Sequence, residues 1–189
     1  MHEHRPVSHL VVVGSSAGGI DALSVLVSSL PEDFPAPIVL AQHLDPTRAS
    51  HLDQILGRRS ALPVRIVVDR EPLANGTLYV VPANRHVSIR DGVLELVNDP
   101  ERPKPSVNLL LSSASEAYGD SLIAVILTGS GSDGANGARI VHEAGGVVII
   151  QNPEGADYPS MPRSLAPNTV DLVADLVQIG DEIDGVGRQ

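Results

Sequence analysis

The chain has 189 residues, a formal net charge of −10 at pH 7, no cysteine and only 2% aromatic residues. This length favours one domain, and the lack of cysteine excludes disulfides, zinc–thiolate sites and thiol nucleophiles. Acidic charge and few aromatic side chains disfavour nucleic acid as a partner, and no apolar run approaches the roughly 20 residues of a membrane span. We therefore expect one cytoplasmic domain over 1–189, without membrane insertion, whose ends at 1–8 and about 181–189 are flexible.

The first half of the chain alternates apolar runs with amphipathic segments. Strands are predicted at 9–13, 37–41, 64–68 and 78–81, and helices at 20–30 and 47–59. A glycine-rich turn, 14–19, joins the first strand to the first helix. Asp91-Gly92 lies between two alternating runs, which is a two-residue hairpin signature. One antiparallel hairpin is therefore expected to interrupt the alternation of strand and helix.

The second half continues the alternation after a charged, proline-rich loop. Helices are predicted at 106–117 and 135–144, and strands at 122–127 and 147–150. The spacing of the last apolar residues predicts one face of a final helix, formed by Leu172, Val173, Leu176 and Val177. The whole pattern predicts an α/β fold with a doubly wound, mostly parallel sheet and an antiparallel hairpin near one edge.

Three polar clusters follow predicted parallel strands: Ser16 follows the first, His43 the second, and Asp133 the strand at 122–127. In open sheets of this class, sites form beyond the carboxyl ends of the strands. A nucleophilic serine needs a base for its proton, and that base needs an acceptor that fixes its tautomer. Ser16, His43 and Asp133 are therefore candidates for nucleophile, base and orienting carboxylate.

Each candidate also has a simpler interpretation. Ser16 could cap the following helix, or the turn 14–19 could be a degenerate dinucleotide loop in which a serine replaces the middle glycine. Ser15 is a rival nucleophile by pattern alone. A lone histidine such as His43 is more often a surface or core residue, and Asp133 in its glycine-rich turn could cap a helix.

Taken together, the clusters resemble the catalytic domain of the chemotaxis protein-glutamate methylesterases, the CheB family. The resemblance is carried, in family order, by segments 14–19 (GSSAGG), 41–43 (AQH), 79–86 (YVVPANRH), 106–108 (SVN), 127–134 (LTGSGSDG), 144–146 (AGG) and 160–163 (SMPR). Family members usually carry an N-terminal receiver domain, whereas only about ten residues precede the first predicted strand. Either the native chain lacks that domain or this sequence is a fragment, and we expect no control of this chain by a receiver of its own.

The resemblance implies that Ser16 rather than Ser15 is the nucleophile, with His43 and Asp133 completing the triad. It also implies oxyanion and substrate loops, which contain Ala17, Ser130, Gly131, Met161 and Arg163. The implied substrates are glutamate γ-methyl esters on chemoreceptor helices, with deamidation of glutamine as a second activity. A methyltransferase and a separate response regulator are candidate partners.

The implied mechanism is two-step acyl transfer that needs no metal and no organic cofactor. The competing interpretation is a non-catalytic module on the same scaffold. Such a module would bind a receptor, a methyltransferase partner or a nucleotide.

Overall fold

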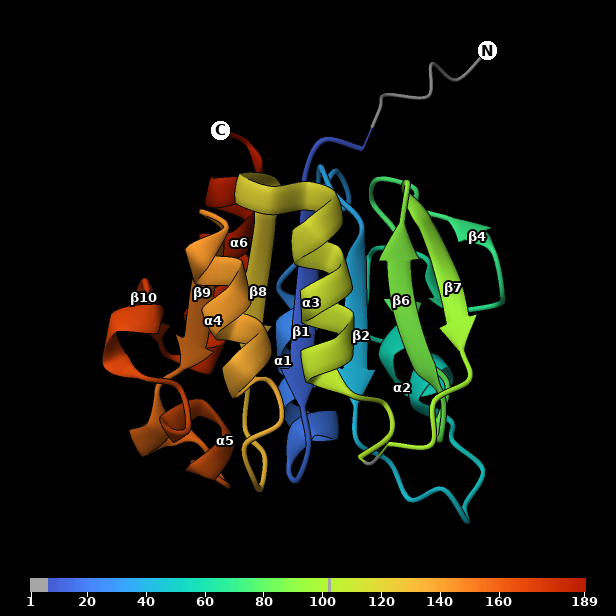
Figure 1. Ribbon diagram of the computed structural model, residues 1–189, viewed down its shortest axis with the longest axis horizontal. Helices are drawn as coiled ribbons and strands as arrows, with labels where there is room; N and C mark the ends of the chain where they lie inside the picture. Colours follow the sequence, from blue (N-terminus) through green and yellow to red (C-terminus); the bar gives the residue numbers. More distant parts are fainter. Residues whose placement is uncertain (1–6, 102) are drawn as a thin grey trace.

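The computed structural model describes residues 7–101 and 103–189, and its centre is a seven-stranded sheet (Figure 1). In spatial order the strands are β10 (Leu172–Ala174), β9 (Val147–Gln151), β8 (Leu122–Ile126), β1 (Leu10–Ser15), β2 (Ile38–Gln42), β5 (Leu78–Val80) and β3 (Val64–Ile66). Each neighbouring pair in this order is parallel. The predicted fold class, a doubly wound and mostly parallel sheet, is confirmed.

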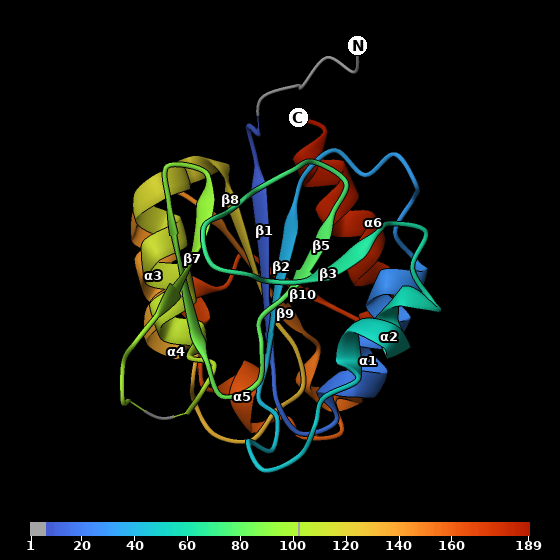
Figure 2. The same ribbon diagram turned by 90° about the vertical axis from the view of Figure 1, so that its right-hand side faces the viewer.

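Helices cover both faces of the sheet, as Figure 2 shows edge-on. One face carries α1 (Gly19–Ser28), α2 (Leu52–Gly57) and α6 (Leu176–Gly187), and the other carries α3 (Val107–Tyr118) and α4 (Ala135–Glu143). A 3₁₀ turn, Gly119–Ser121, precedes β8. Three short helical segments lie between β9 and β10: the 3₁₀ turns Pro153–Gly155 and Pro167–Thr169, and α5 (Ser160–Arg163). Within the described ranges, no helix is both long enough and apolar enough to cross a bilayer.

The central strand β1 shows why this sheet needs helices on both sides. Leu10 and Val12 point into the core shared with α3 and α4, while Val11 and Val13 point into the core shared with α1 and α6. All four side chains are fully buried. A continuous aliphatic run of this kind is typical of a parallel strand that is covered on both faces.

The predicted hairpin is confirmed, within a small separate sheet. This antiparallel sheet contains β4 (Glu71–Pro72), β7 (Val93–Val97) and β6 (His86–Arg90), in that order. Asp91 and Gly92 both have positive φ angles, 50° and 73°, which is the geometry that a two-residue turn between twisted strands requires. The sheet packs beside α3, where the Ile89 amide donates to Ser113 Oγ at 3.0 Å.

The order of the strands determines where a site can form. The chain begins at β1, builds β2, β3 and β5 on one side, and later returns to β8 on the other side of β1. The carboxyl ends of β2, β1 and β8 therefore lie side by side at one edge of the sheet, the lower edge in Figure 1. This reversal of strand order is where ligands bind in folds of this class.

The C-terminal segment differs from the prediction. Leu172 and Val173 belong to edge strand β10 rather than to a helix, and Val173 and Val177 are exposed. Instead of a flexible end from about 181, α6 continues to Gly187. Its true apolar face contains Ile179 and Ile183, which are fully buried against the core next to α1. The described part of the other predicted flexible end begins at residue 7, and 1–6 lie outside the described residues.

The helix predicted at 47–59 is also shorter than expected, since α2 covers only Leu52–Gly57. The side chain of Asp45 accepts hydrogen bonds from the amide and the hydroxyl of Thr47, at 2.9 and 2.6 Å. A local turn of this kind competes with helix formation because it already satisfies the backbone donor. These bonds also lower the pKa of the exposed Asp45 carboxyl.

The buried Tyr79 makes the stability of the protein depend on pH in the alkaline range. Burial raises the pKa of Tyr79 above its usual 10.0, although the hydrogen bond from the Ala74 amide opposes this. As pH rises, the unfolded chain therefore loses the Tyr79 proton before the folded chain does. The contribution of Tyr79 to the free energy of unfolding is constant below about pH 10 and falls as pH rises beyond it. We expect a shallower fall for Tyr79→Phe, measured by denaturant unfolding between pH 8 and pH 11. Tyr158→Phe, at an exposed tyrosine, is the control, and an unchanged slope in Tyr79→Phe would contradict the prediction.

Candidate functional site

Ser16 lies at the carboxyl end of the central strand, in the turn that leads into α1. Its amide donates to the Thr128 carbonyl at 3.0 Å, and its carbonyl accepts from the Gly19 amide at 2.8 Å and from Gln42 Nε2 at 2.7 Å. The backbone of this residue is therefore held by hydrogen bonds to three different segments. That arrangement leaves the side chain as the only free part of the residue.

The two serines at this turn have different environments. Ser15 is fully buried, and its hydroxyl donates to Gln42 Oε1 at 2.5 Å. Ser16 is partly exposed and lines a hollow of about 650 Å³ together with His43 and the first turn of α1. Of the two serines that the sequence leaves open, Ser16 is the partly exposed one that lines this hollow, whereas Ser15 is buried.

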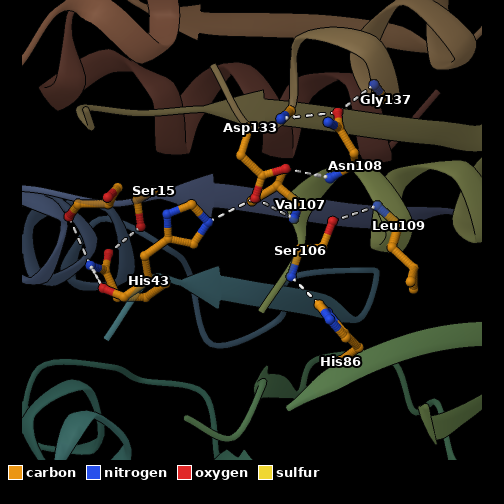
Figure 3. A network of polar contacts seen from close by, with 12 residues as sticks. Ser15, His43, His86, Ser106, Val107, Asn108, Leu109, Asp133 and Gly137 are labelled. Carbon is orange, nitrogen blue, oxygen red and sulfur yellow. Dashed lines mark hydrogen bonds and ion pairs between the residues drawn. The ribbon is translucent and has the colours of Figure 1, made fainter. Parts of the chain in front are cut away.

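His43 and Asp133 meet at this edge although they are 90 residues apart in the sequence. His43 Nε2 lies 2.7 Å from Asp133 Oδ2, and the two side chains are only 16% and 8% exposed. Because a carboxylate can only accept, Nε2 carries the proton, and Nδ1 is the basic nitrogen of the neutral ring. Figure 3 shows the imidazole lying between the end of β1, where Ser15 is labelled, and Asp133. The His43 amide also donates to the Ser15 carbonyl at 3.1 Å, which holds the two strand ends together.

The Asp133 carboxylate is anchored at the start of α3. Oδ2 accepts from the Val107 amide at 2.8 Å, and Oδ1 accepts from the Asn108 amide at 3.0 Å (Figure 3). Amides in the first turn of a helix have no acceptor within the helix, so they form a ready site for an anion. Asp133 does not cap α4, the helix that follows it, whose N-cap is Gly134 without a side-chain bond. Two backbone donors thus fix the orientation of the carboxylate that holds His43.

Asn108, at the start of α3, in turn binds the segment that follows Asp133. Its Oδ1 accepts from the Gly134 amide at 3.0 Å and from the Gly137 amide at 2.7 Å. Asp133 therefore binds the first turn of α3 while Asn108 binds the first turn of α4. Sequence reasoning missed this role: an asparagine near a helix start suggests a cap, but its partners are 26 and 29 residues away.

His86 holds the segment before α3 and lines neither of the hollows at His43. It is fully buried, donates from Nε2 to the Glu101 carbonyl at 3.0 Å, and accepts at Nδ1 from the Ser106 amide at 3.1 Å. Ser106 is the N-cap of α3, where its hydroxyl accepts from the Leu109 amide. His86 Nδ1 therefore positions the start of the helix that binds Asp133, and Nε2 holds the loop that leads to it.

The loop after β8 lies directly against the turn at Ser16. A Cβ added at Gly129 would lie 2.8 Å from Ser16 Cβ and would overlap the Met161 sulfur, so only glycine allows this approach. Thr128 Oγ1 donates to the Ala17 carbonyl at 3.1 Å, which ties the two loops together. Within residues 7–101 and 103–189, the amides of Ala17 and Ser130 have no hydrogen-bond acceptor. These two loops therefore present free donors beside Ser16.

The remaining residues expected in the substrate loops have different environments. Gly131 and Ser130 line a second hollow of about 580 Å³ with His43 and Asp133, and the Gly131 amide donates to Ser160 Oγ at 3.1 Å. Met161 is fully buried behind Gly129. Arg163 is exposed and lines a separate hollow beside β9 and β10. In the described part of the chain, no three His, Cys, Asp or Glu side chains are placed to share a metal ion.

The fold and this site define a doubly wound α/β protein with an accessible serine and a His–Asp pair at the switch point of its sheet. The sequence profile of the family described as CheB methylesterase matches residues 11–183, and the chain belongs to this family. The crystal structure of the Thermotoga maritima CheB methylesterase catalytic domain is similar, with a TM-score of 0.88 and 33% sequence identity, over 96% of this chain and 100% of that chain.

Curated relatives show the same similarity. A Leptospira interrogans protein provisionally named protein-glutamate methylesterase/protein-glutamine glutaminase is 36% identical over 90% of this chain and 91% of its own length. An Anaeromyxobacter dehalogenans protein named protein-glutamate methylesterase/protein-glutamine glutaminase 2 is 39% identical over 82% of this chain, which corresponds to 46% of that protein. The chain therefore spans nearly all of the first relative and about half of the second.

Removal of the Asn108 side-chain amide, which accepts from two amides of the α4 start, should destabilise the protein. In Asn108→Ala the buried amides of Gly134 and Gly137 lose their acceptor, and an unsatisfied buried donor costs about 1–3 kcal/mol. Denaturant unfolding should show this loss, whereas Asn136→Ala, an exposed asparagine on α4, should change the free energy of unfolding by less than about 0.5 kcal/mol. Equal effects of the two substitutions would contradict the assigned role of Asn108.

Proposed function

We propose that this protein is a protein-glutamate methylesterase that hydrolyses glutamate γ-methyl esters with Ser16 as nucleophile, His43 as base and Asp133 as orienting carboxylate. One observation carries the proposal: the 2.7 Å hydrogen bond from His43 Nε2 to Asp133 lies beside the accessible one of the two serines. The printed names of the relatives support the substrate. Deamidation of glutamine by the same route is part of the proposal, because an ester and an amide both react through a tetrahedral intermediate.

The first step forms an acyl-enzyme. His43 Nδ1 takes the proton of the Ser16 hydroxyl while Oγ attacks the ester carbonyl carbon, and the π electrons move to the carbonyl oxygen. The imidazolium is stabilised by Asp133, whose carboxylate stays ionised. When the intermediate collapses, the carbon–oxygen bond to the methoxy group breaks, and methanol leaves with the proton from His43. Water then attacks the acyl-enzyme by the same route and releases glutamate.

Backbone amides would hold the developing oxyanion. The Ala17 and Ser130 amides are the candidate donors, because they have no acceptor among the residues that the structure describes and belong to the two loops that pack at Ser16. The Gly131 amide already has an acceptor, so this residue supports the shape of the loop. Amide donors that are fixed before the reaction stabilise the transition state without reorganisation. Met161 contributes as packing behind Gly129, and Arg163 is left as a candidate contact for a more distant part of the substrate.

The substrate in this proposal is a protein. The two hollows meet at His43, which lines both, so an extended surface on either side of the imidazole is available to a methylated receptor helix. A cytoplasmic location, and a methyltransferase or a separate response regulator as further partners, belong to the same proposal. They rest on the family and not on a contact in the structure.

Loss of the Ser16 hydroxyl should abolish the reaction. Ser16→Ala is expected to lower turnover by about 10⁶-fold. Two measurements check it: methanol release from methylated receptor membranes and covalent labelling by a fluorophosphonate probe. Ser28→Ala, at the far end of α1, is the matched control and should behave as the parent protein. Equal labelling of the parent and Ser16→Ala would rule out Ser16 as nucleophile, and tight nucleotide binding without labelling would favour a non-catalytic module.

Neutralising the carboxylate should slow the reaction while preserving the fold. In Asp133→Asn the side chain no longer favours the tautomer with the proton on Nε2, so turnover should fall roughly 10⁴-fold. Steady-state kinetics give this number, and circular dichroism checks that the fold is retained. A decrease smaller than about tenfold would show that His43 does not depend on this acceptor.

A further inference from the structure

The side chain of Gln42 binds the backbone of both proposed catalytic residues. Its Nε2 donates to the Ser16 carbonyl at 2.7 Å and to the His43 carbonyl at 2.9 Å, and its Oε1 accepts from the Ser15 hydroxyl at 2.5 Å. We propose that Gln42 is a positioning residue that holds the nucleophile and the base in register. This inference rests on the proposed function, in which Ser16 and His43 react together.

The chemistry of the three partners fixes the orientation of the amide group. Both main-chain partners are carbonyl oxygens, which can only accept, so the NH₂ group must face them. The Ser15 hydroxyl is the one partner that can donate, and it faces Oε1. All the hydrogen-bonding groups of the glutamine amide are therefore used by the strand ends that carry Ser16 and His43.

The space around this amide is shaped to accept it. Gln42 is only 4% exposed and is paired with Ser15 in the register of β1 and β2. A Cβ at position 19 would overlap Gln42 Oε1 and would lie 2.9 Å from Ser15 Cβ, so Gly19 leaves room for the glutamine. The Gly19 amide also donates to the Ser16 carbonyl, which therefore has two fixed donors. Gln42 borders the hollow at Ser16, but its amide is held by three hydrogen bonds to the ends of β1 and β2.

A positioning role predicts a particular kinetic effect. Gln42 does not carry a proton in the reaction, but a displacement of about 1 Å between reacting groups can cost about 10²-fold in rate. Since the amide is buried behind the reacting side chains, its loss should lower kcat and leave KM nearly unchanged. A merely structural role would instead lower the stability of the protein without changing kcat of the folded molecules.

Two substitutions separate hydrogen bonding from volume. Gln42→Met keeps the length of the side chain and removes all three hydrogen bonds, whereas Gln42→Glu keeps the shape and the acceptor for Ser15 but removes the NH₂ donors. The matched control is Tyr79→Phe, which removes a buried hydroxyl that accepts from the Ala74 amide and donates to the Pro72 carbonyl, at a position near the opposite end of the strands. Each variant would be measured for kcat and KM in methyl ester hydrolysis, for thermal unfolding, and for hydrogen exchange of the Ser16 and His43 amides.

We expect both Gln42 variants to lose about 10²-fold in kcat, with similar KM and faster exchange of the Ser16 and His43 amides, while Tyr79→Phe keeps its kcat. The inference is overturned if Gln42→Glu retains the kcat of the parent, or if Tyr79→Phe loses as much kcat at equal loss of stability. The parent and Ser16→Ala are run beside them. If these two hydrolyse the ester equally, the proposed function fails and this inference fails with it; if only the parent is active, the Gln42 variants decide this inference alone.

Discussion

The Asp133 carboxylate joins three separate parts of the chain, and the geometry of the site depends on it. It follows β8, accepts from His43 at the end of β2, and accepts from Val107 and Asn108 at the start of α3. At 8% exposure the side chain can find few donors in solvent, so the protein must supply them. A shift of the carboxylate would leave the Val107 and Asn108 amides without an acceptor, so its position is strongly restrained. The hydrogen bond from His43 Nε2 to this restrained carboxylate fixes the orientation of the imidazole ring.

Two side-chain amides extend the same principle to the backbone. Asn108 accepts from two amides of the segment that carries Asp133, and Gln42 donates to two carbonyls of the segments that carry Ser16 and His43. Gln42 is buried, and a buried polar group is costly unless its bonds are made, so it favours a single arrangement of the loops. The site is thus held by bonds to main-chain atoms, and the side chains proposed to react remain free to do so.

Much of this architecture could be predicted from the sequence, because it depends on local patterns. Aliphatic runs followed by glycine-rich turns and amphipathic segments predicted the parallel sheet, and the carboxyl ends of its strands placed Ser16, His43 and Asp133 at one edge. The pattern failed where tertiary contacts decide. Val173 and Val177 fit the predicted helix face, yet Val173 lies in edge strand β10 and both side chains are exposed. The segment after Gly180 is predicted to be flexible, yet it is helical and Ile183 packs against the core.

The roles of Gln42, Asn108 and His86 could not be predicted from the sequence, for a related reason. Each lies within a segment that the family resemblance picked out, but each acts on atoms between 15 and 29 residues away, apart from the bond of Gln42 to the adjacent His43. A single sequence contains no signal for such pairings, because hydrogen-bond partners across strands depend on register and on helix placement.

The first turn of the chain shows how these contacts distinguish two interpretations of one glycine-rich motif. A dinucleotide loop needs free amides at the helix start and close access of a pyrophosphate to the backbone. Here the amides of Ser16 and Gly19 already donate to the Thr128 and Ser16 carbonyls, and the space that Gly19 leaves open is filled by Gln42. Acyl transfer requires one accessible hydroxyl, which Ser16 provides, and one or two amides that can donate to the oxyanion. Among the described residues the Ala17 amide has no acceptor, so it is available for this purpose. Gly19 of this motif therefore serves the packing of the protein's own strands, and in the proposed function the accessible Ser16 hydroxyl is the part of the turn that meets the substrate.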